Sequence, residues 1–360
     1  GTAVSLTDAM IVAGGAGTRL WPLTATTPKP LLPFCGEPFL AGVLARLAEA
    51  GVERVWLIVG ADTAPFRGLD PWAQHLGLRL ETVPEPEPLD TAGGVRTAAE
   101  RVADTFLVLN GDILTDVDLT AAVAAHRRAS AVATLVLTRV DDTSAYGVCV
   151  REGSRIVGFV EKPAPGELPG QDAVNAGTYV LEPDAVLGFP PGPLSFERTV
   201  FPQLVADGQH VEGFVSSAVW ADLGTRERYL EGHRLALEGE LRWPTLGERW
   251  APDVEVAATA QVAPTALLCA GARVGEDARI GPHVVLGRGS QVGAGAQLDD
   301  TVLDAATTVG DDSRLRGVVT GASVRIGCAV TAVDGALVGA QQRIADATTL
   351  SVGATVPARA

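Results

Sequence analysis

The C-terminal part of the chain carries an aliphatic residue at every sixth position, and this repeat limits the fold more than any other feature. Short apolar steps rich in Gly, Ala and Val begin near Val254. A period of six is typical of a parallel β-helix, in which each step turns one aliphatic side chain inward and bends at a small residue. The expected inward residues are Val256, Val262, Leu268, Val274, Ile280, Leu286, Val292 and Leu298, then after slips of register Leu303, Val309 and Leu315, Val324 and Val330, and Val338, Ile344, Leu350 and Val356.

Helical and strand-like segments alternate from the N-terminus to about residue 236. Met10 to Ala13 and Phe106 to Leu109 have the composition of buried strands, and Ala41 to Ala50 has helical spacing. This alternation predicts an α/β domain with a mostly parallel sheet, in which ligands bind beyond the carboxyl ends of the strands. We expect this α/β domain over residues 1–236, a linker over 237–253 and the β-helix over 254–360.

Composition excludes several functions. A formal net charge of −15 repels polyanions, so nucleic-acid binding is disfavoured. Apolar residues make up 47% of the chain, but no apolar run approaches the length of a membrane helix. No secretory signal is visible, and the four cysteines form no CxxC pair. We therefore expect a soluble protein of the reducing cytoplasm, with no nucleic-acid or membrane partner.

A glycine-rich turn follows the first predicted strand. The turn is Gly14-Gly15-Ala16-Gly17, and Arg19 comes two residues later. Such a turn can present successive backbone N–H groups to an anion. The P-loop pattern does not fit, and Leu20 stands where the dinucleotide fingerprint requires its third glycine. The turn therefore predicts another kind of phosphate site, with an ordinary strand-to-helix turn as the alternative.

Lysine is almost absent from the chain. Only Lys29 and Lys162 among the 28 basic residues are lysines, and each precedes a proline. The ammonium group is a compact point charge, whereas guanidinium is a planar fork, so the two are not equivalent at a reacting phosphate. We interpret both lysines as site residues.

The segment GGAGTRLWPLTATTPKPLLP resembles the signature of the sugar-1-phosphate nucleotidylyltransferases, or NDP-sugar pyrophosphorylases, in their mannose-1-phosphate guanylyltransferase branch. EPLDTAGG, LNGD, YGV, EKP, NAGTYVL and WADLG match later segments of that family in order. The resemblance implies a Rossmann-like nucleotidyltransferase domain followed by a left-handed parallel β-helix. It also implies a reaction of a nucleoside triphosphate with a sugar 1-phosphate, catalysed by a homodimer or higher homo-oligomer.

The resemblance also assigns a nucleotide site. By this resemblance, the segment Glu85 to Gly94 is expected to hold the nucleotide base. The family commonly has glycine where this chain has Asp90. A carboxylate from Asp90 or Glu85 suits the N–H donors of guanine and favours GTP, but Asp90 can equally cap the following helix. The nucleotide-binding residues expected by resemblance are Ala13, Gly14, Gly15, Gly17, Thr18, Arg19, Lys29, Glu85, Asp90, Thr91 and Gly111.

Two aspartates follow predicted strands and could share a metal ion. Asp112 follows the strand that ends at Leu109, and Asp222 follows the strand from Val215 to Trp220. Two carboxylates can hold a hard cation and leave positions for phosphate oxygens and water. The family binds Mg²⁺ with the aspartates of these motifs, and the alternative is two unrelated turn residues.

The acceptor pocket is assigned by resemblance alone. Lys162 is expected to meet the phosphate of the sugar phosphate, and the ring hydroxyls are expected to bond to Gly147, Glu161, Asn175 and Thr178. For the Glu161-Lys162 pair, the alternative is an ordinary solvated surface pair. The expected catalytic residues are Arg19, Lys29, Asp112, Lys162 and Asp222.

Several alternatives remain open at this level. Mannose 1-phosphate is the default acceptor, but a heptose 1-phosphate or a sugar-like cyclitol 1-phosphate such as valienol 1-phosphate also fits the family. A catalytically silent regulatory subunit would have the same fold. Hexapeptide β-helices also form acyltransferases, which typically need a histidine base, and the repeat region contains His283.

Overall fold

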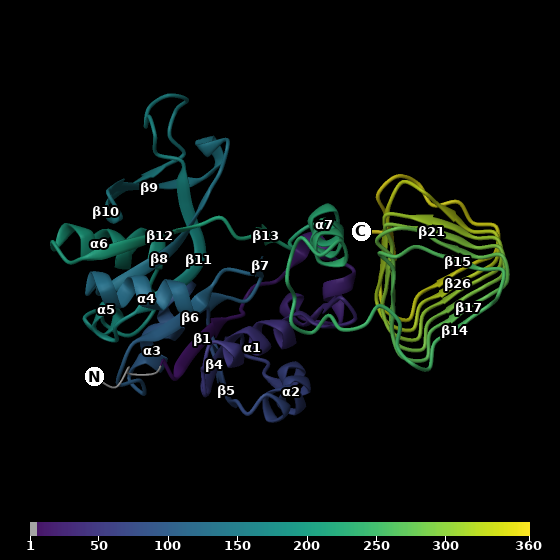
Figure 1. Cartoon of the computed structure of the whole chain (residues 1–360), viewed down its shortest axis with the longest axis horizontal. Helices are drawn as coiled ribbons and strands as arrows, with labels where there is room; N and C mark the ends of the chain where they lie inside the picture. The colour runs from purple at the N-terminus through teal and green to yellow at the C-terminus, as the bar shows by residue number, and fades with distance from the viewer. Residues whose placement is uncertain (1–5) are drawn as a thin grey trace. The chain divides into compact units, whose positions relative to one another are not determined.

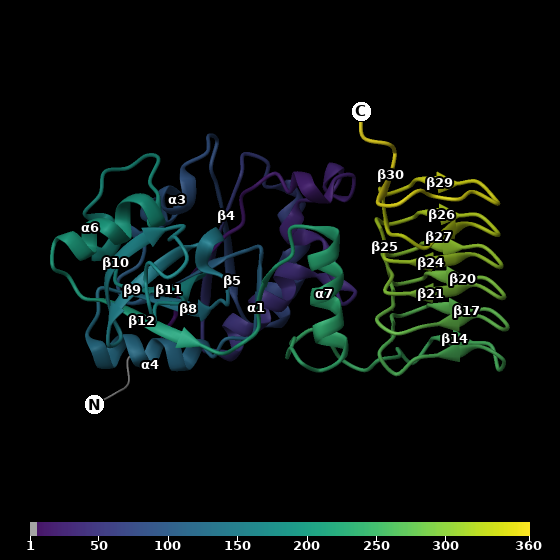
Figure 2. The ribbon, with the colours of Figure 1, turned by 90° about the horizontal axis from the view of Figure 1, so that it is seen from above.

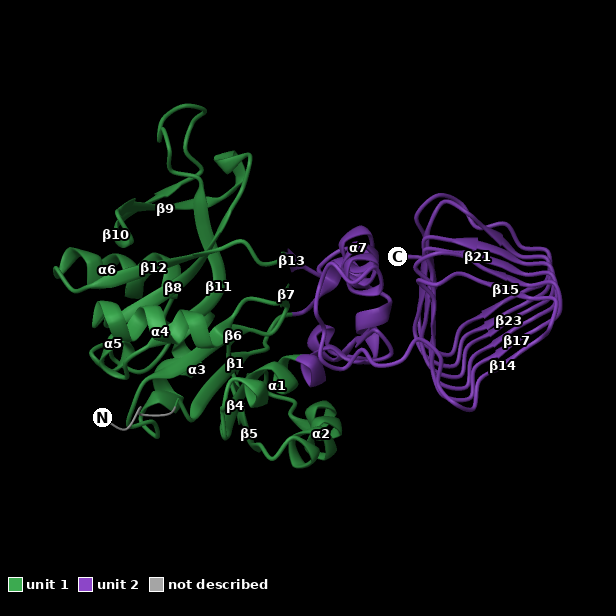
Figure 3. Cartoon of the chain, in the orientation of Figure 1, with its two compact units in different colours: residues 1–15, 43–220 green, residues 16–42, 221–360 purple. Residues whose placement is uncertain are grey.

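The computed structural model describes residues 6–360 (Figure 1). By its contacts the chain divides into two compact units that do not follow chain order (Figure 3). Unit 1 consists of Gly1–Gly15 and Val43–Trp220, and unit 2 consists of Ala16–Gly42 and Ala221–Ala360. The division passes through the glycine-rich turn, after Gly15. No helix within residues 6–360 is long and apolar enough to cross a membrane.

Unit 1 is built on a nine-stranded sheet with the order β5-β4-β1-β6-β11-β8-β12-β10-β9. Its first four strands are parallel, as the alternation of helices and strands predicts. The α/β architecture is confirmed, and antiparallel strands extend it. The strands are β1 (Asp8–Val12), β4 (Arg54–Val59), β5 (Arg79–Pro84), β6 (Phe106–Asn110), β8 (Ala133–Arg139), β9 (Gly147–Glu152), β10 (Arg155–Glu161), β11 (Ala173–Leu181) and β12 (Val211–Ser216).

The antiparallel part has a simple cause. Only Gly153 and Ser154 separate β9 from β10, and a connection this short can join only antiparallel neighbours. Gly153 has φ 63, the left-handed conformation that such a tight turn needs. β11 is also antiparallel to both of its main neighbours, β6 and β8. β12 returns parallel to β8.

The helices of unit 1 complete its core around buried Met10, Val108 and Leu135. Helix α4 shows how local sequence sets the boundaries. The Asp118 carboxylate accepts a hydrogen bond from the Ala121 amide at the start, and Ser130 ends the helix in the left-handed conformation. The remaining elements are α1 (Phe39–Glu49), η4 (Ala64–Leu69), α2 (Asp70–His75), α3 (Asp90–Ala99), β7 (Ile113–Thr115), α4 (Leu119–Ala129), η5 (Thr143–Ala145), α5 (Asp184–Leu187), η6 (Phe196–Val200) and α6 (Phe201–Ala206).

The C-terminal region of unit 2 forms three sheets of short parallel strands, which confirms the predicted parallel β-helix. Its coils lie one above another from β14 to β29 (Figure 2). The first sheet is β14 (Glu255–Val256), β17 (Arg273–Val274), β20 (Gln291–Val292), β23 (Thr308–Val309), β26 (Arg325–Ile326) and β29 (Arg343–Ile344). The second is β15 (Gln261–Val262), β18 (Arg279–Ile280), β21 (Gln297–Asp299), β24 (Arg314–Arg316) and β27 (Thr331–Ala332). The third is β16 (Leu267–Leu268), β19 (Val285–Leu286), β22 (Val302–Leu303), β25 (Val318–Thr320), β28 (Ala336–Val338) and β30 (Ala354–Val356).

The register expected for Val324 and Val330 is wrong. The strand residues that align with Val309 and Leu315 are Ile326 and Ala332. The step from Leu315 to the next inward position is five residues, and this position is Thr320, aligned with Val338. Because Thr320 is polar, it interrupts the aliphatic pattern, and the sequence therefore misplaced the register of the strands that follow it. Val324 and Val330 are fully buried directly before their strands, two residues before Ile326 and Ala332, where most other coils place Ala, Ser or Thr.

The third sheet of the β-helix is mostly apolar on both faces. Its inner residues include Leu268 and Leu286, and the neighbouring outward residues Leu267, Val285 and Val302 are also buried. Non-repeat parts of unit 2 contact this side of the β-helix. The position of a Cβ on Gly36 lies 2.6 Å from Cys269 Sγ, and that on Gly339 lies 3.2 Å from Pro22 Cβ. These contacts explain why residues 16–42 group with the β-helix.

An aromatic cluster joins residues 16–42 to α7 (Arg226–Leu237) and the segment after it. The rings of Phe39 and Trp243 stack with centroids 5.2 Å apart, and Phe34 packs on Trp243 and His233. His233 accepts a hydrogen bond from the Cys35 amide at Nε2 and donates from Nδ1 to the Tyr229 carbonyl. The other short elements here are η1 (Thr18–Leu20), η2 (Leu23–Ala25), η3 (Lys29–Leu31), β2 (Pro33–Phe34), β3 (Glu37–Pro38) and β13 (Trp220–Asp222).

Candidate active site

Ala13 follows β1 and Gly111 follows β6, and the two residues lie next to each other in unit 1. The Gly111 amide donates a hydrogen bond of 2.8 Å to the Val12 carbonyl, and the Ala13 amide donates to Ile58 on the other side. A Cβ on Gly111 would lie 3.1 Å from the Val12 oxygen and 3.2 Å from Ala13 Cβ. Ala13 and Gly111 are therefore in contact at one edge of the sheet, and Asp112 follows directly.

The glycine-rich turn needs glycine for two different reasons. Gly15 has φ 130, a conformation that other residues rarely adopt, although a Cβ there would meet nothing within 4 Å. Gly17 has φ 57, and its Cβ would lie 2.9 Å from Lys29 Cβ and 3.0 Å from Thr24 Cγ2. The absent side chain of Gly17 is what allows Lys29 to lie against the turn. Thr18 and Arg19 follow in η1 and are exposed.

In unit 2, three predicted catalytic residues converge on Gly224. A Cβ on Gly224 would lie 2.6 Å from Arg19 Nη2, 2.8 Å from Asp222 Oδ1 and 3.3 Å from Lys29 Nζ. Gly224 also donates a backbone hydrogen bond of 2.9 Å to Asp222 Oδ1. The structure thus brings together a guanidinium, an ammonium and a carboxylate that are distant in the sequence.

Arg228 is a fourth member of this cluster, and the sequence analysis missed it. Its guanidinium forms an ion pair with Asp222. Arg228 lies in the first turn of α7, where Thr225 caps the helix by accepting its amide at 3.3 Å. The cluster therefore has three cationic groups around one carboxylate, an arrangement that favours a polyanionic ligand. No sequence signal distinguishes Arg228 from the other arginines of α7.

A metal ion at the described residues would take most of its ligands from substrate, and it would compete with Arg228 for the Asp222 carboxylate. Within residues 6–360 no group of three His, Cys, Asp or Glu side chains could hold a metal. Mg²⁺ typically uses one or two carboxylates and fills its other positions with phosphate oxygens and water. Asp222 lies beside Arg19 and Lys29, where phosphate is expected. Asp112 belongs to unit 1 and Asp222 to unit 2, so their pairing stays a prediction.

Glu85 presents a buried acceptor without a partner. It follows β5, and its amide donates to the Val59 carbonyl at 2.8 Å. A Cβ on Gly94 would lie 2.5 Å from Glu85 Oε2, so the glycine in α3 makes room for the carboxylate. Burial raises the pKa of Glu85, and a hydrogen bond from the Gly94 backbone opposes that shift. Among the described residues, Oε2 is buried and has no side-chain hydrogen-bond partner, and it faces Gly94 inside the unit.

Asp90 is engaged at the start of α3. Its Oδ1 accepts a hydrogen bond of 2.8 Å from the next amide, that of Thr91, and its carboxylate forms an ion pair with Arg198. Asp90 has φ 59, a conformation that aspartate tolerates better than most residues. A base would have to compete with Arg198 for this carboxylate. Asp90 is the first residue of α3 and its side chain makes no capping hydrogen bond, so this geometry supports neither base reading nor helix capping.

A cavity of about 160 Å³ in unit 1 contains three of the predicted acceptor residues, Gly147, Glu161 and Asn175. Glu161 and Gly147 are register partners on β10 and β9, and a Cβ on Gly147 would lie 2.7 Å from Glu161 Oε2. Apolar walls and a few polar groups are typical of a small-ligand site. The full lining is Tyr146, Gly147, Cys149, Phe159, Glu161, Val174, Asn175, Glu197 and Phe201.

Two predicted acceptor residues do not line this cavity. Lys162 follows β10 with φ 46, and its amide donates to the Tyr146 carbonyl at 2.9 Å, while its side chain is exposed. Thr178 is buried within β11 and pairs with Leu109. Tyr146 and Glu197 also line the cavity but were not predicted: Tyr146 stands in the YGV segment, of which only Gly147 was assigned a role, and Glu197 stands in no motif that the sequence analysis used.

The Asn175 amide has a defined orientation. Its Nδ2 donates a hydrogen bond of 2.8 Å to the Tyr179 hydroxyl, and its Oδ1 accepts one of 2.8 Å from the Gly177 amide. The pairing of β11 with β8 shifts register between Asn175 and Tyr179. Irregularities of this kind commonly re-aim a side chain next to a ligand site.

His283 cannot serve as a free base in this structure. Its Nδ1 lies 2.9 Å from Asp300 Oδ1, and its Nε2 lies 2.7 Å from Glu238 Oε1. Both ring nitrogens therefore contact carboxylates, and the side chain is 14% exposed. This arrangement supports a structural role and weighs against the acyltransferase alternative.

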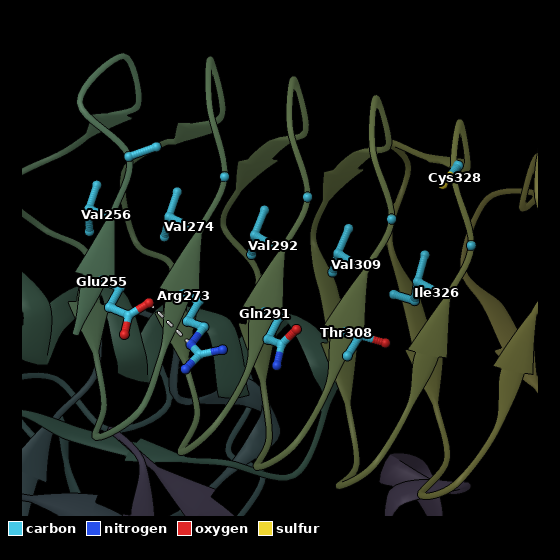
Figure 4. A pocket seen from close by; sticks show the side chains of 15 residues that line it. Glu255, Val256, Arg273, Val274, Gln291, Val292, Thr308, Val309, Ile326 and Cys328 are labelled. Atoms are coloured by element: carbon cyan, nitrogen blue, oxygen red, sulfur yellow. Dashed lines mark ion pairs between the residues drawn. The ribbon is translucent and has the colours of Figure 1, made fainter. Parts of the chain in front are cut away.

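A larger cavity of about 600 Å³ runs along the β-helix (Figure 4). The outward residues along it are Glu255, Arg273, Gln291 and Thr308, and Arg273 forms an ion pair of 3.4 Å with Glu255. None of the predicted site residues lines this cavity.

Comparison with known proteins identifies relatives for both parts of the chain. The family model described as nucleotidyl transferase matches residues 8–239, and the model described as GMPPB C-terminal domain matches residues 254–360. The mannose-1-phosphate guanylyltransferase of Mycobacterium tuberculosis is 41% identical over 272 residues, which span 73% of this chain and 74% of that protein. The mannose-1-phosphate guanylyltransferase catalytic subunit beta of Danio rerio is 36% identical over 64% of this chain and 64% of its own length, so that match spans less than two thirds of the relative.

Solved structures agree on the α/β fold. HddC from Yersinia pseudotuberculosis is similar with a TM-score of 0.54 and 27% identity over 63% of this chain and 98% of HddC. A second HddC structure, complexed with GMP-PN, has a TM-score of 0.53. A putative glucose-1-phosphate thymidylyltransferase from Bacillus anthracis shares the fold, with a TM-score of 0.57 and 22% identity. On the family match over residues 8–239, the chain belongs to the nucleotidyl transferase family.

Proposed function

We propose that this protein is a sugar-1-phosphate guanylyltransferase that converts GTP and a sugar 1-phosphate, mannose 1-phosphate by default, into GDP-sugar and pyrophosphate. The observation that carries the proposal is the convergence of Arg19, Lys29 and Asp222 on Gly224, which matches the charge of a triphosphate. The relatives named mannose-1-phosphate guanylyltransferase support the choice of substrates.

The reaction is an in-line displacement at the α-phosphorus of GTP. A phosphate oxygen of the sugar 1-phosphate forms the new P–O bond, and the bond from the α-phosphorus to the bridging oxygen of pyrophosphate breaks. A phosphate monoester has a second pKa near ~6, so the nucleophile is mostly dianionic at neutral pH and needs no general base. Catalysis then depends on positioning and on neutralising charge.

The cationic residues have separate roles in this scheme. Arg19 and Lys29 hold the triphosphate, and Lys162 holds the acceptor phosphate. Nucleotidyltransferases of this family generally use a divalent metal, and we propose Mg²⁺ held by Asp112 and Asp222. When bound, the metal would neutralise phosphate charge. Arg228 keeps Asp222 in place by their ion pair.

Glu85 supports guanine as the base. Its carboxylate is a hydrogen-bond acceptor at the end of β5, and guanine offers the adjacent N1–H and N2–H₂ donors. Uracil and thymine offer one imide N–H between two carbonyl acceptors, which would place an acceptor near the carboxylate. The HddC complex with GMP-PN shows that a related fold binds a guanine nucleotide.

Pyrophosphate release from a panel of substrates tests the proposal. The panel combines the four nucleoside triphosphates with mannose 1-phosphate, a heptose 1-phosphate and valienol 1-phosphate. We expect GTP to give the highest kcat/KM, and the preferred acceptor identifies the sugar. Activity with none of the pairs would overturn the enzyme assignment and support the regulatory-subunit alternative. Sedimentation of the same sample tests the expected homo-oligomer.

A further inference from the structure

The first turn of α7 contacts the end of the third sheet of the β-helix, and both belong to unit 2. Arg226, the first residue of α7, donates a hydrogen bond of 3.1 Å from Nη1 to the Gly317 carbonyl. Gly317 directly precedes β25, and its carbonyl also accepts a hydrogen bond from the Ala336 amide in the next coil. The Arg226 side chain is 19% exposed. The guanidinium is therefore held at a corner of the β-helix.

The absence of a side chain at Gly335 makes this contact possible. Gly335 directly precedes β28 and has φ 79. A Cβ at this position would overlap Nη1 of Arg226. The overlapping atom is the end of a long, flexible side chain, so a methyl group could displace the guanidinium without moving the backbone of the β-helix. Glycine at position 335 thus provides the space that Arg226 fills.

This anchored turn carries half of the charged cluster at the candidate active site. The charged residues around Gly224 form the phosphate cluster, which consists of Arg19, Lys29, Asp222 and Arg228. Asp222 and Arg228 form an ion pair, and Arg226 lies between them in the chain. The contact of Arg226 with Gly317 therefore fixes the segment that positions both residues.

The same part of the β-helix contacts the other half of the phosphate cluster. Gly339 directly follows β28, and a Cβ there would lie 3.2 Å from Pro22 Cβ and 3.3 Å from Pro22 Cγ. Pro22 lies between η1, which contains Arg19, and η2. The strand β28 therefore has one contact at each end, with Arg226 before it and with Pro22 after it.

The remainder of α7 is held by other contacts. The Tyr229 hydroxyl donates a hydrogen bond to the Pro33 carbonyl, and His233 accepts one from the Cys35 amide within the aromatic cluster. Loss of the Arg226 contact should therefore loosen the first turn of α7 and leave the helix in place. The role of Arg226 can for this reason be tested in a folded protein.

We propose that the β-helix positions the phosphate cluster through β28, with Arg226 as the positioning residue that attaches α7 to this strand. This inference rests on the proposed function, because it takes the phosphate cluster as the site of the triphosphate. The β-helix contributes to nucleotide binding without touching the nucleotide. It holds the two segments that carry the cluster, residues 18–20 through Pro22 and residues 222–228 through Arg226.

Gly335→Ala is the first test, with Mg²⁺-pyrophosphate as the probe in a calorimetric titration. The new methyl group takes the place of the Arg226 guanidinium but leaves its charge in the protein. We expect the dissociation constant for pyrophosphate to rise about tenfold, the usual effect of losing one positioning hydrogen bond. The acceptor KM should stay unchanged, because the residues of the acceptor cavity belong to unit 1.

Gly353→Ala is the matched control. Gly353 occupies the same position one coil further along the sheet, directly before β30, and has φ 61. A Cβ there would meet none of the described atoms within 4 Å. Both alanine variants carry a similar backbone strain, so both should lower the melting temperature. Only Gly335→Ala should lose affinity for pyrophosphate.

Variants of Arg226 show whether the effect passes through this side chain. Arg226→Ala should weaken pyrophosphate binding at least as much as Gly335→Ala, and the double variant should be no weaker than Arg226→Ala. Arg226→Lys, which keeps the charge and a donor for the Gly317 carbonyl, should retain part of the affinity. Glu227→Gln removes only the other partner of Arg226 and should leave the affinity unchanged.

The outcomes separate this inference from the proposed function. Wild-type protein that binds neither pyrophosphate nor GTP overturns the assignment of the phosphate cluster and the proposed function with it. A wild type that binds pyrophosphate, with equal affinity in Gly335→Ala or with the same loss in Gly353→Ala, overturns the inference alone. If Gly335→Ala does not fold, Arg226→Ala decides, and wild-type affinity in that variant would refute the role of Arg226.

Discussion

Lys29 lies directly against Gly17, with its Cβ 2.9 Å from the position that a Cβ on Gly17 would occupy. The same lysine reaches Gly224 with its ammonium group, 3.3 Å from the corresponding Cβ position. The aliphatic part of Lys29 therefore contacts the glycine turn, and its charge lies beside Arg19 and Asp222.

We expect Gly17→Ala to reduce kcat/KM for GTP by about 100-fold. The new methyl group would displace Lys29, and the left-handed φ of 57 adds strain of about 1 kcal/mol. Initial rates of pyrophosphate release measure the effect. Gly51→Ala is the control, because Gly51 also has a positive φ, 89, but open space around it. It should lower the melting temperature while activity stays near wild type.

Asp112→Asn should abolish Mg²⁺-dependent pyrophosphate release. The amide keeps the shape of the side chain but removes the charge that a hard cation requires. Titration with Mg²⁺ at saturating substrates checks this expectation. Turnover at the wild-type rate would refute the metal assignment. Asp116→Asn offers a nearby comparison, since Asp116 accepts a structural hydrogen bond from the Val219 amide at 3.1 Å.

Glu85→Gln should reduce the preference for GTP over the other nucleotides by about tenfold to 100-fold. The glutamine amide presents a donor where the carboxylate would accept two guanine N–H groups. Because burial raises the pKa of Glu85, the carboxylate that binds guanine is lost at a higher pH than for an exposed glutamate. The GTP affinity of the wild type should therefore decline as pH falls through this raised pKa. The variant should lack that decline in nucleotide titrations at several pH values.

His283→Ala should leave pyrophosphate release within about twofold of wild type, because both ring nitrogens are held by Asp300 and Glu238. The substitution removes two contacts, so we expect the melting temperature to fall by a few degrees. An acyltransferase would show the opposite pattern, with lost transfer activity, and this would be measured with acetyl-coenzyme A.

His233 should make stability depend on pH. Burial lowers the pKa of His233 to about 4, from about 6.5 in the unfolded chain. The folded protein therefore binds fewer protons than the unfolded chain between these values, so stability falls as pH decreases from 6.5 towards 4. The contribution is of the order of 3 kcal/mol at the acidic end. Melting temperatures of wild type and His233→Gln should converge across this range, whereas the exposed His75→Gln should follow wild type throughout.

The limits of sequence analysis are clearest in the β-helix. The repeat was evident because one aliphatic side chain per step is a local pattern. The register of Ile326 and Ala332 was missed because Thr320 stands at an inward position, where its hydroxyl lies 3.3 Å from the Asp304 amide. A polar residue can be buried when a neighbouring coil supplies its partner, and spacing alone does not show that partner.

Local spacing was sufficient for the existence of the β-helix and for the glycine-rich turn, since both depend on residues close together in the chain. Tertiary packing decided that residues 16–42 group with the β-helix, that Arg228 joins Asp222, and that Thr91 donates a hydrogen bond to Glu197. These relationships join residues far apart in sequence. They arise because buried apolar surfaces and hydrogen-bond donors must find partners in three dimensions, and a linear pattern does not record which partners they find.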